Sequence, residues 1–367
     1  MKRDLFLRNK LKVLQPNSHI VVLCPGFAAD ESDVNCITYL QYFLLHLKKL
    51  APDKKISIIA FEYPFINKCY EWNGITVHSM GGKSKKGLYK IITWLKVIYC
   101  FRKINKSSKV TAVMSFWLRE CSFIGLLLSK QFSFKFFALM QGQDSLSGNW
   151  YLRFLKGKKI EFVSHSTFNA KIFQQSTGAT CQYVVPFGVD YENIYQEWPL
   201  ENTKRSIDII GIGSLLPVKN YTLFLELISE LKSAFPALRV VILGEGPQRV
   251  LLQHKINLLG LKEIVVLKGF VGIRAELFKL LNQSKIFLHT SKHEGQCYAF
   301  MEAYAYGLEV VSFDVGYLPN TNKSHRCTSK AEMLECLRSL LASELKFEVI
   351  PVRSMQETAL ELNALLD

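Results

Sequence analysis

The sequence predicts an α/β protein with two doubly wound parallel sheets, one in each half of the chain. Short apolar runs rich in Val and Ile alternate with amphipathic stretches of helical period, which is the pattern of parallel strands joined by helices. The alternation stops once, in a polar stretch, and then starts again. The 367 residues, 49% of them hydrophobic and 21% charged, suffice for two domains with complete cores.

The first half opens on its clearest strand, HIVVLCPG at 19–26, a β-branched apolar run that ends in Pro-Gly. A helical stretch follows at 35–50. Further strands are expected at 56–64, 74–80, 109–117, 135–142 and 159–166. We therefore expect residues 1–190 to form the first α/β domain.

The stretch 184–206 lacks periodicity and is interpreted as the linker between the domains. The alternation then resumes with strands at 206–215, 238–246, 264–271 and 285–291, and with helices at 221–235, 248–260 and 273–284. We expect 203–351 to form the second domain and a helix at 352–367 to pack back on the first. Ligands of such sheets bind outside the carboxyl ends of the strands, so the strand-end loops are the place to search for a site.

Cysteine usage and apolar runs exclude several classes of protein. The nine cysteines stand singly, without a Cys-x-x-Cys pair, which indicates a reduced, cytosolic chain without a disulfide framework. No zinc-ligand spacing is present, so no metal site is expected. Lys and Arg interrupt residues 1–15, unlike a secretory signal, and no apolar run reaches the ~18 residues of a membrane span.

The positive charge is concentrated in the first half. The chain carries a net +15, and residues 1–190 contain 27 Lys and Arg against 11 Asp and Glu, a balance of +16. A nucleic acid, an anionic membrane or an acidic substrate could each pair with such a surface. Nucleic acid is disfavoured, because no zinc-finger or RNA-binding signature is present and aromatic residues do not interleave with the basic ones.

Two strand-end loops have glycines suited to anion binding. In GIGSLLPVKN, at 211–220, a strand ends at Gly213 and Lys219 follows six residues later. Glycine lets backbone amides approach an anion, and an ammonium group adds a point charge. LGEGP, at 243–247, places Gly244 in a second turn of this kind. Neither is a P-loop or a complete dinucleotide fingerprint, and an ordinary tight turn is the alternative for both.

The stretch HTSKHEGQCYAFMEAYAYG, at 289–307, contains Glu294 and Glu302 with seven residues between them. A helix is expected to begin just after Gly295, where its dipole favours an anion. The amides expected to point out of this helix start are those of Gln296, Cys297 and Tyr298. A diphosphate would lie on these amides, and the two carboxylates would accept hydrogen bonds from hydroxyl groups on either side. The alternative is that Glu294 caps the helix and Glu302 is solvated or paired.

Six segments, in this order, resemble retaining glycosyltransferases of family 4. They are VVLCPGFA, VVPFGVD, GIGSLLPVKN, VILGEGPQR, VVLKGFV and HEGQCYAFMEAYAYGLEVVSFDVG. The resemblance implies the GT-B fold: two facing Rossmann-like domains with parallel sheets, the first binding the acceptor and the second the nucleotide-sugar. It also implies a hexosyltransferase that moves a sugar from a UDP- or GDP-sugar to a hydroxyl of a glycan or lipid-linked acceptor in cell-surface polysaccharide synthesis. No cofactor or metal ion is implied.

The resemblance also assigns roles to residues. Lys219 would bind the donor diphosphate, and Glu294 would meet the donor sugar; these two are the expected catalytic residues. Glu302 would hold the ribose. The other donor-binding residues implied are Gly26, Gly213, Ser214, Gly244, Phe270, Val271, Gly295, Gln296, Cys297 and Tyr298. Gln141 and His165 are expected on the acceptor side, although His165 can also be a loop histidine.

The sequence departs from the family pattern in ways that concern the donor. Ser214 stands where an arginine is usual, so one positive charge on the diphosphate is missing. Gln296 and Cys297 replace the usual Phe-Gly, and Gln141 replaces a histidine and cannot titrate. Two alternatives stay open: a non-catalytic GT-B subunit that binds a nucleotide-sugar, and a nucleotide-sugar epimerase, which would need more titratable groups than Glu294.

The stretch 81–109 combines an apolar stripe with many cations. The stripe, at helical spacing, is Leu88, Ile91, Ile92, Leu95 and Ile98. The basic residues are Lys83, Lys85, Lys86, Lys90, Lys96, Arg102, Lys103, Lys106 and Lys109. One interpretation is that this face docks a cytoplasmic protein on the anionic inner face of the cytoplasmic membrane, near a lipid-linked acceptor. The other is that the stripe packs on the sheet of its own domain.

Overall fold

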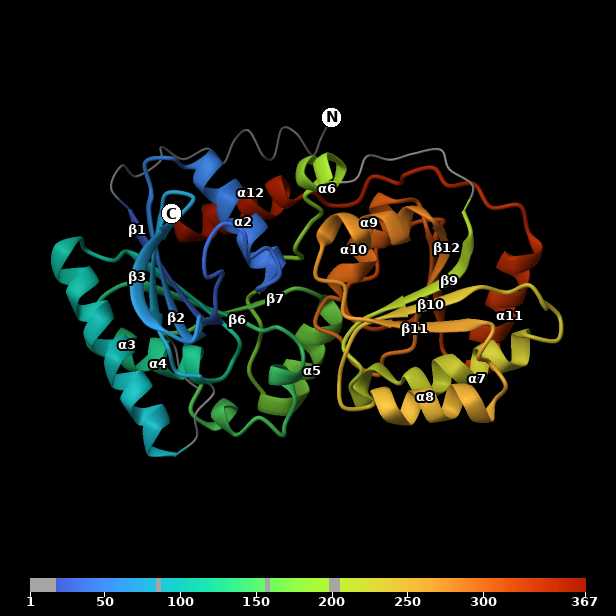
Figure 1. Cartoon of the computed structure of the whole chain (residues 1–367). Helices are drawn as coiled ribbons and strands as arrows, with labels where there is room; N and C mark the ends of the chain where they lie inside the picture. Colours follow the sequence, from blue (N-terminus) through green and yellow to red (C-terminus); the bar gives the residue numbers. More distant parts are fainter. Residues whose placement is uncertain (1–17, 84–86, 156–158, 198–204) are drawn as a thin grey trace. The chain divides into compact units, whose positions relative to one another are not determined.

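The structure is a computed structural model that describes residues 18–83, 87–155, 159–197 and 205–367. It divides into two compact units (Figure 1). Unit 1 comprises Met1–Phe187 and Met355–Asp367, and unit 2 comprises Gly188–Ser354. Within the described ranges, no helix combines the length and the apolar character needed to cross a bilayer.

Unit 1 is built on a sheet with the strand order β3-β4-β2-β1-β5-β6-β7-β8. Its strands are β1 (His19–Gly26), β2 (Lys55–Tyr63), β3 (Asn67–Trp72), β4 (Ile75–Met80), β5 (Ala112–Phe116), β6 (Lys135–Leu139), β7 (Glu161–Ser164) and β8 (Tyr183–Val184). Strand β1 pairs in parallel with both β2 and β5, and its residues 20–23 are fully buried. This burial explains the unbroken apolar run in the sequence, since a central parallel strand is covered on both faces.

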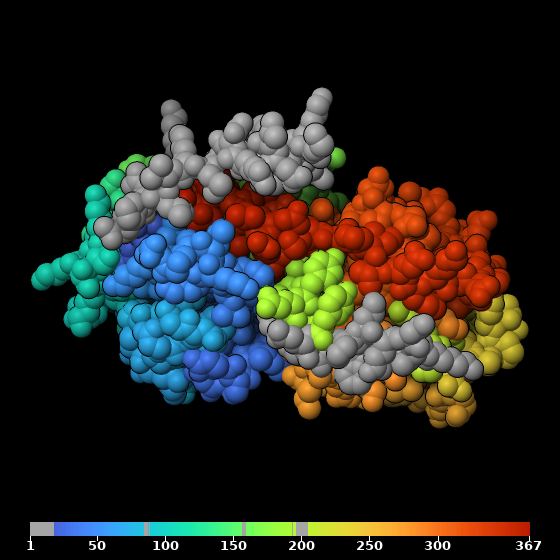
Figure 2. Space-filling model, turned by 90° about the horizontal axis from the view of Figure 1, so that it is seen from above, coloured from blue at the N-terminus to red at the C-terminus, as the bar shows by residue number. Residues whose placement is uncertain are grey.

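The helices of unit 1 are α2 (Thr38–Leu50), α3 (Leu88–Ser107), α4 (Glu120–Ser129), α5 (Thr167–Thr177) and α12 (Met355–Leu366), with the 3-10 turns η1 (Gln143–Ser145) and η2 (Trp150–Arg153). The last helix, α12, packs against α2, and the two lie side by side in Figure 2. Buried Lys54 donates to Asn363 Oδ1 of α12 at 2.8 Å, and Thr358 Oγ1 donates to the Pro186 carbonyl at 2.8 Å. These polar contacts fix α12 on unit 1.

Unit 2 is built on a parallel sheet with the order β11-β10-β9-β12-β13-β14. Its strands are β9 (Ile207–Ile212), β10 (Val240–Leu243), β11 (Val265–Gly269), β12 (Ser284–His289), β13 (Glu309–Phe313) and β14 (Ser324–Cys327). Its helices are α6 (Tyr191–Glu197), α7 (Tyr221–Leu231), α8 (Arg249–Leu258), α9 (Arg274–Asn282), α10 (Tyr298–Ala305) and α11 (Lys330–Ala342), with the 3-10 turn η3 (Pro217–Lys219).

Alternate residues of these strands enter two different cores. Ile286 packs in a cluster with residues of α7, α8 and α11, whereas the next residue, Phe287, packs in a cluster with residues of α6, α9 and α10. Successive side chains of a strand point to opposite faces, so the two clusters lie on opposite sides of the sheet. The predicted doubly wound arrangement is thereby confirmed for unit 2.

Two elements differ from the sequence-based expectation. Strand β3 pairs antiparallel with β4, so the sheet of unit 1 is not purely parallel; its polar sequence, NKCYEW, suits an edge strand. The stretch interpreted as a linker contains helix α6, in which Ile194 is fully buried and Tyr195 donates its hydroxyl proton to the Ala305 carbonyl at 2.7 Å. Tertiary packing therefore made a helix where the sequence lacks helical periodicity; residues 198–204 lie outside the described ranges.

Helix α3 does not bury the apolar stripe expected from the sequence. Ile91, Ile92 and Leu95 are 46%, 49% and 60% exposed, whereas Val97 and Phe101 are fully buried against the sheet. The interpretation that the stripe packs on its own domain is therefore wrong for these three residues, although Ile98 is half-buried against the core. The Leu88 side chain and residues Lys85 and Lys86 lie outside the described part of the chain.

Candidate functional site

The loops that follow β9, β10 and β11 meet at the carboxyl edge of the unit 2 sheet. The amide of Gly213 donates to the Leu243 carbonyl at 3.0 Å, and the amide of Gly244 donates to the Gly269 carbonyl at 2.8 Å. A Cβ on Gly244 would lie 1.9 Å from the Gly213 carbonyl oxygen, and its φ of 143° falls where glycine is favoured. Glycine at position 244 is therefore required for the first two loops to approach this closely.

Lys219 ends the 3-10 turn η3, and the residues after β12 hold this turn in place. Thr290 Oγ1 donates to the Lys219 carbonyl at 3.1 Å, and Ser291 Oγ donates to the Val218 carbonyl at 3.1 Å. The amide of Lys292 also donates to Val218, at 2.9 Å. Two motifs far apart in the sequence are thus fastened to one another by hydrogen bonds.

These contacts bring together Lys219, Glu294 and His289. Lys219 Nζ lies 2.5 Å from Glu294 Oε1, and His289 Nε2 lies 2.9 Å from the same oxygen. A carboxylate oxygen only accepts, so the imidazole carries its proton on Nε2. Both hydrogen bonds end on Oε1, and the described residues offer no partner to Oε2. Oε2 can therefore accept a hydrogen bond from a ligand hydroxyl, while the ammonium has two further N–H donors for an anion.

The charges of this cluster stabilise one another. Burial raises the pKa of Glu294, but the hydrogen bond from His289 and the charge of Lys219 outweigh it and bring that pKa down to about 2. Burial lowers the pKa of Lys219, but Glu294 outweighs it and the pKa of the ammonium stands above its ordinary value. Burial also lowers the pKa of His289, despite its hydrogen bond to Glu294. At neutral pH the cluster therefore consists of a carboxylate, an ammonium and a neutral imidazole.

Cys297 gives this cluster a set of potential metal ligands. The ligand atoms of His289, Glu294 and Cys297 lie within 4.8 Å of one another. Burial raises the pKa of the Cys297 thiol above its ordinary value, whereas a metal binds the thiolate. The ammonium of Lys219 already supplies the positive charge beside Glu294. We therefore keep the expectation that the ammonium of Lys219, and not a metal ion, is the cation of this site.

Helix α10 begins later than predicted. Its first residue is Tyr298, and Cys297 precedes it in the left-handed region with φ 64°. The expectation that the helix begins just after Gly295 is therefore wrong. Gln296 lies in the loop, where its carbonyl accepts from the Tyr317 amide at 2.9 Å. Of the three amides predicted at the helix start, only that of Tyr298 belongs to the helix.

Glu302 lies in the second turn of α10 and is paired rather than solvated. Its side chain is 5% exposed and forms an ion pair with Arg274 of α9. The guanidinium of Arg274 also lies over the ring of Phe278, 4.6 Å from its centroid. Sequence reasoning missed Arg274, because nothing in its own stretch relates it to a glutamate 28 residues later.

The loop after β13 packs on the stretch that carries Glu294. A Cβ on Gly316, which has φ 68°, would lie 2.9 Å from Glu294 Cβ and 2.7 Å from the Gln296 carbonyl oxygen. A side chain at position 316 would therefore displace Glu294 or the loop. The sequence offered a signal for Gly316, a glycine three residues after the end of β13, but no role was assigned to it.

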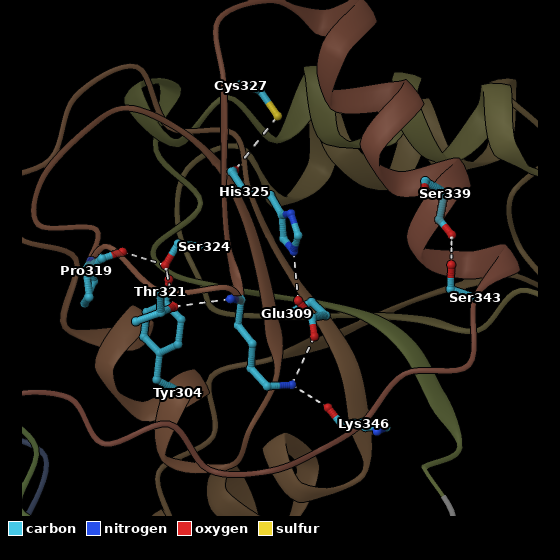
Figure 3. Close-up of polar contacts among 11 residues, drawn as sticks. Tyr304, Glu309, Pro319, Thr321, Ser324, His325, Cys327, Ser339, Ser343 and Lys346 are labelled. Carbon is cyan, nitrogen blue, oxygen red and sulfur yellow. Dashed lines mark hydrogen bonds and ion pairs between the residues drawn. The ribbon is translucent and has the colours of Figure 1, made fainter.

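A polar network anchors this loop to β14 (Figure 3). Ser324 Oγ donates to the Pro319 carbonyl at 2.6 Å and lies 2.6 Å from the hydroxyl oxygen of Tyr304 on α10. Glu309, at the start of β13, accepts from His325 Nε2 at 2.8 Å. Strands β13 and β14, the loop and α10 are thus joined, and the network supports the backbone beside Glu294.

The remaining residues predicted for unit 2 lie in the same set of loops. Ser214 is exposed after β9. Phe270 follows β11 with 66% of its surface exposed, and Val271 is half-buried against the core. The structure therefore places all the donor-binding residues predicted for the second domain at the carboxyl edge of one sheet or in helix α10.

The other three predicted residues, Gly26, Gln141 and His165, lie in unit 1. Gly26 ends β1, where an added Cβ would lie 3.2 Å from Tyr63 Cβ. Gln141 follows β6 and His165 follows β7, and Gln141 Nε2 lies 3.0 Å from His165 Nε2. The structure thus brings Gln141 and His165 together, and among the described residues no hydrogen bond joins Gly26 to either of them.

His165 determines how the Gln141 amide is oriented. His165 Nδ1 lies 3.0 Å from the Val185 carbonyl, which only accepts, so the proton is on Nδ1 and Nε2 accepts from Gln141. Gln141 Oε1 in turn accepts from the Tyr39 hydroxyl at 2.9 Å. Burial lowers the pKa of His165 to about 4, so the ring is neutral near pH 7. This favours a positioning role for His165, and Tyr39 is a partner that sequence reasoning missed.

The Glu294 cluster predicts a loss of stability in acid. Because the pKa of Glu294 is depressed from 4.5 to about 2, its stabilising contribution is complete above pH 4.5 and is lost as the pH falls towards 2. That depression corresponds to roughly 3 kcal/mol. The lowered pKa of His289 adds a loss that begins as the pH falls below 6.5. Hydrogen exchange of the α10 amides should show both losses.

The control for this measurement is Glu294→Gln, which cannot titrate. Its α10 should be less stable than that of the wild type at pH 7, and the difference should shrink as the pH falls from 4.5 towards 2. An equal difference at every pH would contradict the pKa assigned to Glu294.

The second half of the chain is similar to known proteins in sequence. Residues 195–342 match the family model described as glycosyl transferases group 1. Over 157 residues the chain is 37% identical to a human subunit of phosphatidylinositol N-acetylglucosaminyltransferase, a match that covers 43% of this chain and 32% of that protein. The corresponding subunit from Arabidopsis thaliana is 28% identical over 157 residues, with 43% and 35% covered. The chain thus matches about a third of the length of these relatives.

Solved structures match nearly the whole chain. Sucrose-phosphate synthase from Thermosynechococcus elongatus gives a TM-score of 0.69 at 12% identity, covering 95% of this chain and 94% of that chain. HepE from Anabaena, in complex with UDP and glucose, gives 0.62 at 14% identity, covering 95% of each. At these identities the likeness shows the fold alone. With the family match, it confirms the predicted GT-B fold class and the resemblance to glycosyltransferases.

Proposed function

We propose that the chain, whose residues 195–342 match the family model described as glycosyl transferases group 1, is a retaining glycosyltransferase that moves a sugar from a nucleotide-sugar to a hydroxyl group. The observation that carries the proposal is the cluster of Lys219, Glu294 and His289 at the carboxyl edge of the unit 2 sheet. It combines a cation for a leaving diphosphate with a carboxylate oxygen for sugar hydroxyls.

Each residue of the cluster has a role in this proposal. The ammonium of Lys219 stabilises the charge that develops on the diphosphate as it leaves, which is electrostatic preorganisation. Oε2 of Glu294 accepts from a donor sugar hydroxyl, while His289 and Lys219 hold Oε1 and keep the carboxylate ionised. Glu302, oriented by Arg274, accepts from the ribose hydroxyls.

One carbon–oxygen bond forms and one breaks in the proposed reaction. The acceptor oxygen forms a bond to the anomeric carbon on the face from which the diphosphate leaves. The bond between the anomeric carbon and the diphosphate oxygen breaks, and the proton of the acceptor hydroxyl passes to a donor phosphate oxygen. No metal ion takes part, because Lys219 supplies the positive charge. Turnover should therefore continue after chelation of divalent cations.

The names of the relatives suggest which donor to test first. The human relative is named for N-acetylglucosaminyl transfer to phosphatidylinositol, and a Streptococcus parasanguinis relative, 25% identical over 192 residues with 52% of this chain and 37% of that protein covered, is named for UDP-N-acetylglucosamine. We propose a UDP-sugar as donor, with UDP-N-acetylglucosamine as the first candidate. The proposed acceptor is a hydroxyl of a lipid-linked glycan, bound through unit 1 with Gln141 and His165.

A thermal-shift panel of UDP-, GDP- and ADP-sugars tests the donor. A nucleotide-sugar at 100 times its dissociation constant should stabilise the protein by ~2.7 kcal/mol, and we expect this with the UDP-sugars. Glu294→Ala should abolish transfer by the proposed enzyme, whereas a non-catalytic subunit would keep its function. NMR of the product should show a retained anomeric configuration and no epimerised donor. An inverted product, or epimerised donor without transfer, would contradict the proposal.

A further inference from the structure

The outer face of helix α3 exposes large apolar side chains along its length. Ile92, Leu95 and Tyr99 follow one another at three- and four-residue spacing and are 49%, 60% and 63% exposed. Tyr89 and Ile91 add exposed surface at the start of the helix, 61% and 46%. The buried face of α3 already packs on β2, β4 and α4, so these side chains are additional to the core. Exposed apolar patches of this kind mark interaction surfaces.

A chain of aromatic rings connects helix α3 to a second element with exposed apolar side chains. Trp94 of α3 lies 5.5 Å from Phe123 of α4, which lies 5.6 Å from Phe154. Phe154 lies 5.2 Å from Trp150 of η2. The last two are 46% and 52% exposed, although a loop far from α3 in sequence carries them. Trp94 and Phe123 themselves are partly buried against the core, and Lys90 Nζ lies 6.0 Å from the centroid of the Tyr151 ring in η2. The exposed Trp150 and Phe154 therefore lie beside the start of α3.

All charges supplied by the α3 segment are positive. Residues 72–119 contain ten Lys and Arg and no Asp or Glu. Lys96, Lys103 and Lys106 are exposed on α3, and the described residues offer them no carboxylate partner. Lys90 is the exception, because Glu120 of α4 pairs with it. Lys103 Nζ lies 5.2 Å from the centroid of the Tyr99 ring, so cation and apolar side chains are interleaved.

We infer that this surface, made of the outer face of α3 together with Trp150 and Phe154, inserts into an anionic lipid bilayer surface. An anionic bilayer matches both properties of this surface. Its acyl chains can bury the Ile, Leu and Trp side chains, and its anionic headgroups can pair with the Lys side chains. Tyr and Trp are the side chains that favour the headgroup level. A second copy of the chain would set positive charge against positive charge, and a nucleic acid would leave Ile92 and Leu95 exposed. The inference stands on this surface and not on the proposed transfer.

Vesicle flotation of the full chain, without any sugar donor, tests the inference. Vesicles with about a third of phosphatidylglycerol should bind at least tenfold more protein than pure phosphatidylcholine vesicles. The triple variant Ile92→Ser, Leu95→Ser, Tyr99→Ser should bind to the anionic vesicles at least tenfold more weakly than the wild type. A second triple variant, Lys96→Gln, Lys103→Gln, Lys106→Gln, should show the same loss. The matched control is Val250→Ser, Leu251→Ser, Leu258→Ser, which removes exposed apolar side chains from α8 of unit 2 and should bind as the wild type does.

A fluorescence measurement tests the second element. Brominated acyl chains should quench the part of the tryptophan emission that Trp150→Phe removes. Equal binding to both vesicles, full binding by the α3 variants, or an unquenched Trp150 would overturn the inference. Binding to a DNA or RNA duplex but not to anionic vesicles would overturn it in favour of nucleic acid. An unchanged melting temperature of each variant shows that a loss of binding is not a loss of folding. Because no donor is present, failure here leaves the proposed transfer untouched.

Discussion

A Lys219→Met variant is expected to lose about two to three orders of magnitude in turnover, the range seen when one charge-stabilising donor of an active site is removed. The variant should also be destabilised by about 3–5 kcal/mol, because Glu294 is left as a buried carboxylate without its cation. Turnover is measured with the donor that the thermal-shift panel identifies. Stability is measured by hydrogen exchange in α10.

The double variant Lys219→Met, Glu294→Gln separates these two effects. Replacing both members of the ion pair removes the unpaired charge, so most of the stability should return, but turnover should not. Lys255→Met is the matched control, because Lys255 pairs with Glu226 in a more exposed setting, with side chains 21% and 37% exposed. It should cost less than 1 kcal/mol and leave turnover unchanged. A double variant that regains both would show that Lys219 acts only on the fold.

An Arg274→Met variant is expected to destabilise the packing of α9 against α10 by about 3–5 kcal/mol, since the Glu302 carboxylate would remain buried without a partner. The double variant Arg274→Met, Glu302→Gln should recover most of that loss. If Glu302 holds the ribose, this folded double variant should still bind the nucleotide about 10- to 100-fold more weakly, the loss of one hydrogen bond to a charged group. Isothermal titration with UDP provides the measurement.

The control for the Arg274→Met variant is Arg249→Met. Arg249 pairs with Glu245 four residues before it, and both side chains are well exposed, 40% and 48%. This variant should cost less than 1 kcal/mol and keep its affinity for UDP. Unchanged UDP affinity in the Arg274 and Glu302 double variant would remove Glu302 from the proposed donor site, whatever its effect on stability.

Features encoded within one segment were predictable. The run HIVVLCPG became the central strand β1, because a β-branched apolar run fits only a strand covered on both faces. The strand-end glycines at 213 and 244 became close backbone contacts, because glycine alone adopts their φ angles without strain. The order of the six motifs led to the family that the comparison confirmed for residues 195–342.

Contacts between distant segments were not predictable. Arg274 pairs with a glutamate 28 residues later, and Tyr39 with a glutamine 102 residues later. Helix α6 forms in a stretch without helical periodicity because Ile194 is fully buried in the core of unit 2. Helix α10 starts at Tyr298, later than predicted, because Cys297 adopts a left-handed backbone conformation. No local propensity favours this conformation for cysteine.

The sequence by itself determined the alternation of strands and helices, the positions of the strand-end loops and the sign of the charge on the first half. The tertiary structure decided which side chain meets Glu294 and Glu302, and which face of α3 is left outside. The hydrophobic period of a strand or helix and the residue preferences of a turn depend on neighbours within a few residues, so both can be predicted from the local sequence. Partners and exposure depend on how whole elements pack, and packing is settled by segments that the local sequence does not contain.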